Sequence, residues 1–501
     1  MANEVGTASD LEDLFGKIVT FLTTNASLVA DTQQWKVLRQ RRDNIAALTT
    51  SIVPNGTSWR SVLQTCRYDS RSLNVDNESS ATATIYSNTF SAGVSHVTWQ
   101  LRQAAEISAV RLRAPVSASY VTYMIRNYRL QYSDDGAAWT TCLTVASSPI
   151  YTSGEWKDFA VSSPGSHMYW RIVIDSTQNG SGTAVSWQGM LLLEADGTVA
   201  NHFGSEVIFK STGTAGTDEI FTGIRSEYDE AAGWYNLFMN GYTGYDPNEE
   251  SWLKQPGALP GYGQTYPLAV PMVPCWNTTM PYWFAASGRS FRFAVKVSTS
   301  YEGGYLGFIL PYATPGQYPY PLAVGGSLVP TDSSRSSEWR YSYANARHGV
   351  YPGPGADRYA SSEGSWATLY LRDPNGSWSP FTNRGSTSMT PDGIYGPQYS
   401  TGGGASGAWR SVWPHCMNDQ WTLGKRAYRE CLGGGYVLQP CVLMQRASTP
   451  AVFGELEGTY AISGYSNAPE NTTTWGGDTV VVFQQAYRNS IHEFWALALS
   501  S

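Results

Sequence analysis

The sequence predicts a mainly β protein with a short N-terminal helix, in which a β-rich platform is interrupted by a β-sandwich. Aromatic residues make up 13% of the 501 residues and glycine accounts for 49 of them, which suits strands and tight turns. Short alternating runs recur about every ten residues between 58 and 198, the spacing typical of a sandwich. Helical periodicity is clear only near the start of the chain.

The composition excludes several classes of protein. Charged residues are 15% of the chain, against about 25% in an average soluble domain, and the net charge is −7. We interpret the one short basic cluster, residues 39–42, as a solvated helix end, and we expect no nucleic-acid binding. No apolar stretch approaches the roughly 18 residues of a membrane span, and the first residues do not read as a signal peptide. We therefore expect no membrane insertion.

The first element is an amphipathic helix over residues 9–24. Ser9 and Glu12 have the spacing of a capping box. Its apolar face comprises Leu11, Leu14, Phe15, Ile18 and Leu22. Beyond Asn25 the helical pattern decays, and residues 35–38 favour a short extended segment.

Alternating runs predict the strands of the sandwich and of the platform. The sandwich strands are expected at 128–132, 156–159, 169–174 and 190–194. Ser133 to Gly136 predicts a turn, after which Trp139 is expected to fill the sandwich core. Alternation over 291–297 predicts a half-buried strand, whereas the continuous apolar run 480–483 predicts a strand covered on both faces.

The segments "ISAVRLR", "YRLQYSDDGAAW", "GEWKDF", "MYWRIVI" and "WQGMLLLEA" occur in this order and resemble the discoidin, or coagulation-factor type C, domain. The resemblance covers about 140 residues. It implies an eight-stranded jelly roll that binds glycans, lipids or proteins through loops at one end and does not catalyse a reaction.

The flanking sequence resembles structural proteins of tailed bacteriophages. The similar segments include "EVGTASDLEDLFGKIVTFLTTN", "EVIFKSTGTAGTDEIFTGIRSEYD", "WYNLFMNGYTGYD" and the closing "FWALAL", and together with further matches they cover roughly 350 residues. The resemblance implies three regions: 1–55 as the helix and start of the platform, 56–199 as the discoidin-like insert, and 200–501 as the rest of the platform, with room for two subdomains.

Two loops of the implied jelly roll contain the candidate ligand-binding residues. Tyrosine suits such a site because it is rigid, amphipathic and stacks on sugar faces. The loop 116–127 and the loop 176–183 are expected to be neighbours at one end of the sandwich. The candidates are Tyr120, Tyr123, Arg126, Asn127, Gln178 and Asn179.

The chain contains no motif that predicts catalysis, a metal site or a cofactor. The six cysteines show no C-x-x-C spacing, and we interpret them as free thiols. No G-x-S-x-G elbow and no phosphate-binding loop is present. Carboxylates between 200 and 260 are interpreted mainly as solvated charges. They are Asp218, Glu219, Asp229, Glu230, Asp246, Glu249 and Glu250.

These observations predict a virion structural protein of the tail tip or baseplate, assembled in the host cytoplasm. The expected partners are other virion proteins, further copies of this chain, and a host-surface glycan such as lipopolysaccharide. A capsid decoration or head-fibre protein would share the same features. A tail-associated glycan depolymerase that uses the 200–260 carboxylates is the third alternative, and loss of activity in Asp229→Asn or Glu230→Gln would locate its site.

Overall fold

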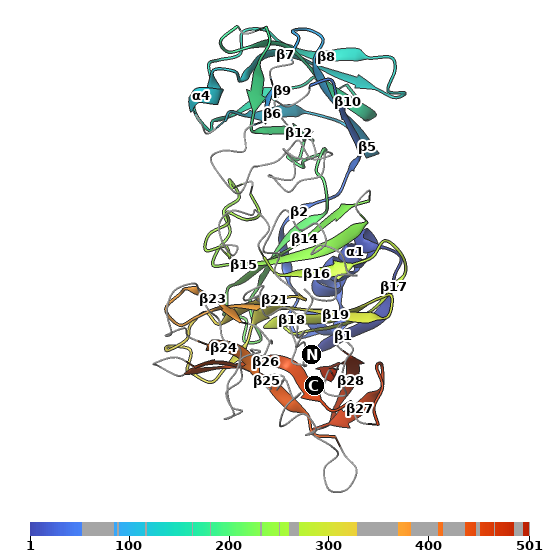
Figure 1. Ribbon diagram of the computed structural model, residues 1–501, viewed down its shortest axis with the longest axis vertical. Coiled ribbons are helices and arrows are strands. Elements are labelled where there is room, and N and C mark those ends of the chain that lie inside the picture. Colours follow the sequence, from blue (N-terminus) through green and yellow to red (C-terminus); the bar gives the residue numbers. More distant parts are fainter. Residues whose placement is uncertain are drawn as a thin grey trace, which may run out of the picture.

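The computed structural model describes residues 1–52, 85–87, 90–115, 118–162, 164–180, 182–230, 233–249, 251–259, 270–327, 369–381, 409–413, 436–446, 451–464, 466–484 and 494–499. The predicted fold class is confirmed, because strands dominate and helices are few and short. The sandwich occupies one end of an elongated molecule, and stacked platform sheets occupy the rest (Figure 1). Within the described residues no helix is long and apolar enough to cross a membrane.

The chain begins with β1 (Ala2–Ala8), which precedes the predicted helix α1 (Leu11–Thr24). All five residues of the predicted apolar face are buried. The predicted cap is wrong by one residue. Asp10 caps the helix by accepting a hydrogen bond from the Asp13 amide at 2.8 Å, and the Asp13 carboxylate accepts from the Ser9 amide at 2.8 Å. The Glu12 carboxyl group therefore takes no part in capping the helix. A short helix, α2 (Ala26–Ala30), follows.

Two antiparallel sheets form the sandwich. One has the order β3-β5-β10-β7-β8 and the other β12-β6-β9, and a short β11-β4 pair completes the described part. The strands are β3 (Ile45–Thr50), β4 (Ile85–Ser87), β5 (His96–Ala105), β6 (Ala109–Arg113), β7 (Ile125–Ser133), β8 (Thr140–Val145), β9 (Trp156–Ala160), β10 (His167–Thr177), β11 (Val185–Trp187) and β12 (Gly189–Leu193). The short helix α4 (Ala118–Val121) lies between β6 and β7. The sequence analysis placed β3 in the platform, but β3 pairs with β5, so the sandwich begins at Ile45.

Large aromatic side chains fill the space between the two sheets of the sandwich. Trp99, Trp170 and Tyr128 are completely buried. Trp139 is not part of this core, contrary to the prediction. It is half-buried beneath the Arg171 guanidinium, 4.0 Å from the ring centroid. The predicted turn is present: Ser133 Oγ accepts a hydrogen bond from the Gly136 amide at 2.9 Å, and Gly136 has a φ of +72° that favours glycine.

The platform sheet nearest the sandwich has the order β16-β15-β14-β13-β2. Its strands are β2 (Lys36–Arg41), β13 (Glu206–Ser211), β14 (Ile220–Asp229), β15 (Trp234–Tyr242) and β16 (Met272–Cys275). The predicted helix end at 39–42 is wrong, since these residues belong to or follow a strand. Arg39 donates to the buried carboxylate of Glu206 at 2.9 Å. The extended segment predicted at 35–38 coincides with the start of this strand, but the charged residues that follow were misread because Arg39 faces a buried partner.

A second platform sheet has the order β1-β17-β18-β19-β21-β22-β23. Its remaining strands are β17 (Met280–Ala286), β18 (Ser290–Val297), β19 (Ser300–Phe308), β21 (Leu322–Gly325), β22 (Leu369–Arg372) and β23 (Trp378–Phe381). The strand predicted at 291–297 exists, but it is buried on both faces rather than half-buried. Arg292 is 0% exposed and lies 3.0 Å from the Glu457 carboxylate, which compensates its charge.

The C-terminal sheet has the order β24-β25-β26-β29-β28-β27, with β20 paired to β26. Its strands are β20 (Leu310–Pro311), β24 (Trp409–Trp413), β25 (Gln439–Arg446), β26 (Ala451–Ile462), β27 (Thr472–Trp475), β28 (Asp478–Gln484) and β29 (Phe494–Ala498). The run 480–483 is buried on both faces of β28, as predicted. Cys142, Cys275 and Cys441 are free thiols, and the other three cysteines lie outside the described residues.

Candidate functional site

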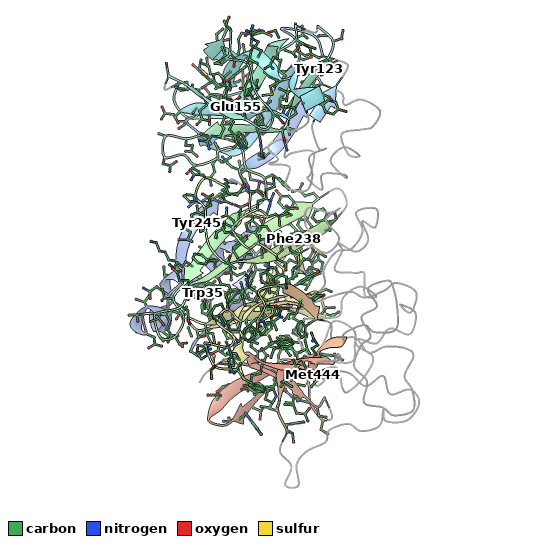
Figure 2. All side chains as sticks on the ribbon, turned by 90° about the vertical axis from the view of Figure 1, so that its left-hand side faces the viewer. Trp35, Tyr123, Glu155, Phe238, Tyr245 and Met444 are labelled. Carbon is green, nitrogen blue, oxygen red and sulfur yellow. The ribbon has the colours of Figure 1, made fainter. Side chains whose placement is uncertain are left out.

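Three loops form the end of the sandwich that lies away from the platform. The chain leaves the sandwich at Leu193, which pairs with Ala109, whereas the other end of β12, Gly189, pairs with Arg113. The strand ends near Arg113 are therefore the remote ones. The loops there connect β6 to β7, β8 to β9, and β10 to β11. Figure 2 shows Tyr123 and Glu155 in this domain, well separated from Trp35 and Phe238 of the platform.

The structure places the two predicted loops side by side. The Asn179 amide donates to the Thr122 carbonyl at 2.9 Å, and the Gln178 amide donates to the Met124 carbonyl at 2.8 Å. The Ser186 hydroxyl adds a bond of 2.6 Å to the Tyr120 carbonyl. These backbone contacts join the loops into one surface. Residues 116, 117 and 181 of these loops lie outside the described residues.

Three of the six candidate residues brace the third loop, 146–155, which the sequence analysis did not select. Gln178 accepts from the Tyr151 amide at 2.8 Å and donates to the Tyr151 carbonyl at 3.2 Å. Asn127 accepts from the Ser147 amide at 2.7 Å. Arg126 donates to a carbonyl of the same loop at 3.3 Å. The polar groups used in these bonds position the loop, so we assign these three residues a positioning role.

The other three candidates lie on the two predicted loops themselves. Tyr120 and Tyr123 are half-buried, and Asn179 is exposed. The Asn179 side chain accepts from the Thr177 hydroxyl at 3.0 Å. Tyr120 is the third residue of α4, and the Tyr123 amide donates back to its carbonyl at 2.9 Å. The two tyrosines therefore lie on one compact turn of chain beside the braced loops.

Cations and aromatic rings gather at the same end of the sandwich, where the sequence analysis selected no residue. Lys157 Nζ lies 4.8 Å from the Tyr151 ring centroid and donates to the Ile150 carbonyl at 2.7 Å. The Arg113 guanidinium lies 5.3 Å from the Trp156 ring centroid. Ile150 is 64% exposed. The sequence feature that could have indicated this group is the stretch "YTSGEWK" at 151–157, in which aromatic and basic residues flank a turn.

Hydrogen bonds from the loop hold a negative charge within this group. The Glu155 carboxylate accepts from the Thr152 amide at 2.7 Å and from its hydroxyl at 3.0 Å. The backbone bond chiefly lowers the pKa of Glu155, so the side chain stays ionised near neutral pH. Aromatic rings, paired cations and a fixed carboxylate on rigid loops suit the binding of a hydroxyl-rich ligand.

Among the described residues, no group of three or more His, Cys, Asp or Glu could hold a metal ion. Two of the seven candidate carboxylates, Glu219 and Asp246, take part in a surface pair and a turn. Glu219 lies 2.5 Å from Lys210 Nζ, and Asp246 accepts from the Asn248 amide at 2.9 Å. The side chains of Asp229 and Glu250 lie outside the described part of the chain.

No family model and no curated protein matches this chain. It is similar to a solved carbohydrate-binding module of a family 31 glycoside hydrolase from Clostridium perfringens, with 15% identity over 30% of this chain and 95% of that one and a TM-score of 0.22. The family 32 carbohydrate-binding module of Streptococcus pneumoniae EndoD shares 16% identity over 30% of this chain and 99% of that one, with a TM-score of 0.22.

A third similar structure is the family 32 module of Clostridium perfringens NanJ, solved in complex with galactose. It shares 12% identity over 30% of this chain and 97% of its own, with a TM-score of 0.22. These similarities concern less than a third of the chain. The sandwich is defined by the strand pairing of this chain itself.

Proposed function

We propose that this chain is a non-enzymatic structural component of a tailed-phage particle, in the tail tip or baseplate, whose sandwich binds a host-surface glycan. The observation that carries the glycan-binding part is the braced group of three loops at the remote end of the sandwich. Gln178 fixes two of these loops to each other before any ligand arrives. Because the loops are already ordered, binding of a ligand costs little conformational entropy. A small contact area can therefore give useful affinity.

The arrangement of the molecule supports an adhesive rather than a catalytic role. The sandwich projects from one end, while both chain termini lie in the platform (Figure 1). Charged residues are only 15% of the chain and its net charge is −7, so few charges are available to repel neighbouring copies or other virion proteins. A particle that presents many copies turns a weak single-site contact into strong attachment.

Binding of the full chain to purified host lipopolysaccharide and to a glycan array tests the adhesive role. Tyr120→Ala and Tyr123→Ala are expected to weaken binding about tenfold each, because tyrosines are frequent hot spots of binding surfaces. Tyr312→Ala is the matched control, since this tyrosine is 58% exposed but lies in the platform. Equal binding by all three variants would refute the loop assignment.

Electron cryo-microscopy of the intact particle tests the structural role. We expect density for this chain in the tail, with the remote end of the sandwich directed outward. Density on the capsid would instead support the decoration or head-fibre alternative. Release of reducing ends from host polysaccharide, lost in Glu230→Gln, would contradict the non-enzymatic assignment.

A further inference from the structure

A cavity of about 700 Å³ lies at the junction between sandwich and platform. Helix α1, the chain crossing at 42–43, strand β5 of the sandwich and strands β14 and β15 of the platform contribute to its wall. The carboxyl groups of Glu12 and Asp43 line this cavity, and neither belongs to the three-loop site of the sandwich. Ligand sites and regulatory groups often occur at such domain boundaries.

Glu12 links the helix to the platform sheet. Its two carboxyl oxygens accept hydrogen bonds from the hydroxyls of Ser205 and Ser226. The Ser205 hydroxyl also accepts from the Asp43 amide at 3.1 Å, and the Ser226 hydroxyl accepts from the Ser205 amide at 2.7 Å. One carboxyl group is therefore connected to both chain segments that join sandwich and platform.

Asp43 ties these segments to the sandwich itself. Its side chain is 2% exposed and lies 3.3 Å from Arg102 Nε on β5. Asp43 also accepts from the Tyr228 hydroxyl at 2.7 Å and from the Gly204 amide at 3.2 Å. Arg102 in turn donates to the Tyr228 hydroxyl at 2.6 Å. The ionised Asp43 is thus compensated by Arg102, whereas the described hydrogen-bond partners of the Glu12 carboxyl group are two neutral hydroxyls.

The charged and titratable groups around Glu12 come from every element that lines the cavity. Asp10 lies on the same helix end, Arg42 and Asp43 on the crossing, and Arg102 on β5. Glu230 follows β14, and the phenols of Tyr228 and Tyr235 come from β14 and β15. Burial first, and the nearby Asp43 second, raise the pKa of Glu12 to about 7. Burial likewise raises the pKa of Asp43.

We propose that Glu12 and Asp43 form a proton-operated clasp, in which a proton on Glu12 holds the sandwich against the platform and its release loosens the junction. In the protonated state, Glu12 donates to one serine hydroxyl and accepts from the other. When the proton leaves to water in the cavity, two carboxylates remain in one cavity wall, and Arg102 is already paired with Asp43. Their repulsion acts directly on the crossing at residue 43.

The direction of the pH effect follows from the sign of the shift. Because the folded state raises the pKa of Glu12 above its ordinary value of 4.5, the folded state holds the proton more tightly. The stabilisation is complete below about pH 4.5 and is lost as the pH rises toward 7. Neutral and alkaline conditions therefore favour a looser junction, and mildly acidic conditions favour a rigid one.

Hydrogen exchange of the full chain, compared with Glu12→Gln at each pH, tests the clasp. The reporters are the amides of Asp43, Gly204 and Ser205, whose acceptors belong to the clasp. The ratio of wild-type to variant exchange at one pH cancels the intrinsic rate. We expect this ratio to rise at least tenfold between about pH 5 and pH 8.5.

Glu106→Gln is the matched control, because Glu106 is an exposed carboxylate of the sandwich. It should exchange like the wild type at every pH. A flat ratio for Glu12→Gln would overturn the proposal. If Glu12→Gln fails to fold, Asp43→Asn is compared with the wild type instead. Because the Asp43 charge raises the pKa of Glu12, its removal should move the transition of the Gly204 and Ser205 amides to lower pH and make it smaller. An unchanged profile would refute the clasp.

Discussion

The sandwich and the platform bury different kinds of polar residue. The described buried polar residues of the sandwich are all uncharged: Ser95, Thr98, Gln131, Ser133, Ser148, Thr177, Ser186 and Gln188. The platform buries uncharged polar residues too, but it also buries charged side chains: Glu206, Arg225, Glu227, Arg292 and Glu302. A buried charge needs a partner at short range, whereas a neutral group needs only one hydrogen bond. The platform therefore depends on specific charge pairs that the sandwich does without.

The charge pairs of the platform are concentrated around Glu206, which is 1% exposed. Its carboxylate lies 2.9 Å from Arg39, 3.8 Å from Arg41 and 3.9 Å from Arg225. Burial alone would raise the pKa of Glu206, but the arginines outweigh burial and lower it to about 2. This network joins β2, β13 and β14, the sheet on which the sandwich is mounted.

The largest expected effect is the loss of this carboxylate. Glu206→Ala should lower the free energy of unfolding of the platform by about 3–5 kcal/mol, because it leaves buried arginines without their counter-charge. Hydrogen exchange of the slowest β13 and β14 amides measures it. Glu106→Ala, an exposed glutamate of the sandwich, should change stability by less than about 0.5 kcal/mol. If both variants changed the free energy of unfolding by similarly small amounts, the platform would not depend on buried charge pairs more than the sandwich does.

Acid should destabilise the platform before the sandwich. The folded state lowers the pKa of Glu206 to about 2, so its contribution is present above about pH 4.5 and is lost as the pH falls through 2. Burial lowers the pKa of His202 to about 3, so the platform also loses stability as the pH falls below 6.5. For Glu206 alone the loss is about 3 kcal/mol.

Domain-resolved hydrogen exchange between about pH 6.5 and pH 3 measures this difference. Amides of β13 and β14 should lose protection while those of β7 and β10 keep it. Glu206→Gln should weaken the pH dependence of the platform and leave that of the sandwich unchanged. Simultaneous loss of protection in both regions would show that they unfold as one unit.

The same contrast explains which parts of the fold were predictable. The apolar pattern located β7, β9 and β10, in which buried apolar and more exposed polar positions are mixed, and β12, which is an apolar run buried throughout. It underestimated the length of β2, of which only 35–38 was predicted as extended, and the burial of β18, because Arg39 and Arg292 point toward buried carboxylates rather than solvent. Each arginine is compensated by a glutamate far away in the sequence. Arg39 and Glu206 are 167 positions apart, and Arg292 and Glu457 are 165 positions apart. Local sequence does not contain that information.

The candidate site was predictable in place but not in detail. The family resemblance indicated which loops meet at one end, and residues of both loops do contact each other there. It did not indicate that Gln178 and Asn127 would be used to fix a third loop. The Glu12–Asp43 pair was missed because Glu12 was assigned to a helix cap. The actual cap, Asp10, directly follows the predicted cap Ser9.

A smaller effect is expected for the amide that braces the loops. Gln178→Ala should destabilise the 146–155 loop locally by about 1–2 kcal/mol, because it removes both bonds to the Tyr151 backbone. Faster exchange of the Tyr151 amide measures it. Asn179→Ala is the matched control, as an exposed neighbour on the same turn. Global unfolding of the sandwich by Gln178→Ala would contradict a purely local role.

The smallest effect is expected for a charge on the outer face of the sandwich. Arg171 lies over the Trp139 ring and donates to Gln131 Oε1 at 2.6 Å. Burial, and then repulsion from Arg129, lower the pKa of Arg171. These two unfavourable effects offset part of the stabilisation from its contacts with Trp139 and Gln131. Arg171→Ala should therefore lower the free energy of unfolding of the sandwich by only about 1 kcal/mol.

Urea unfolding followed by tryptophan fluorescence measures this loss, with Arg171→Lys as the comparison. Lysine keeps the positive charge but lacks the planar guanidinium that stacks on the Trp139 ring, so it should restore less than the full stability. Recovery by lysine would show that charge, rather than stacking, is what matters at this position. A loss of about 3–5 kcal/mol in Arg171→Ala would mean that the sandwich depends on charged contacts as strongly as the platform does.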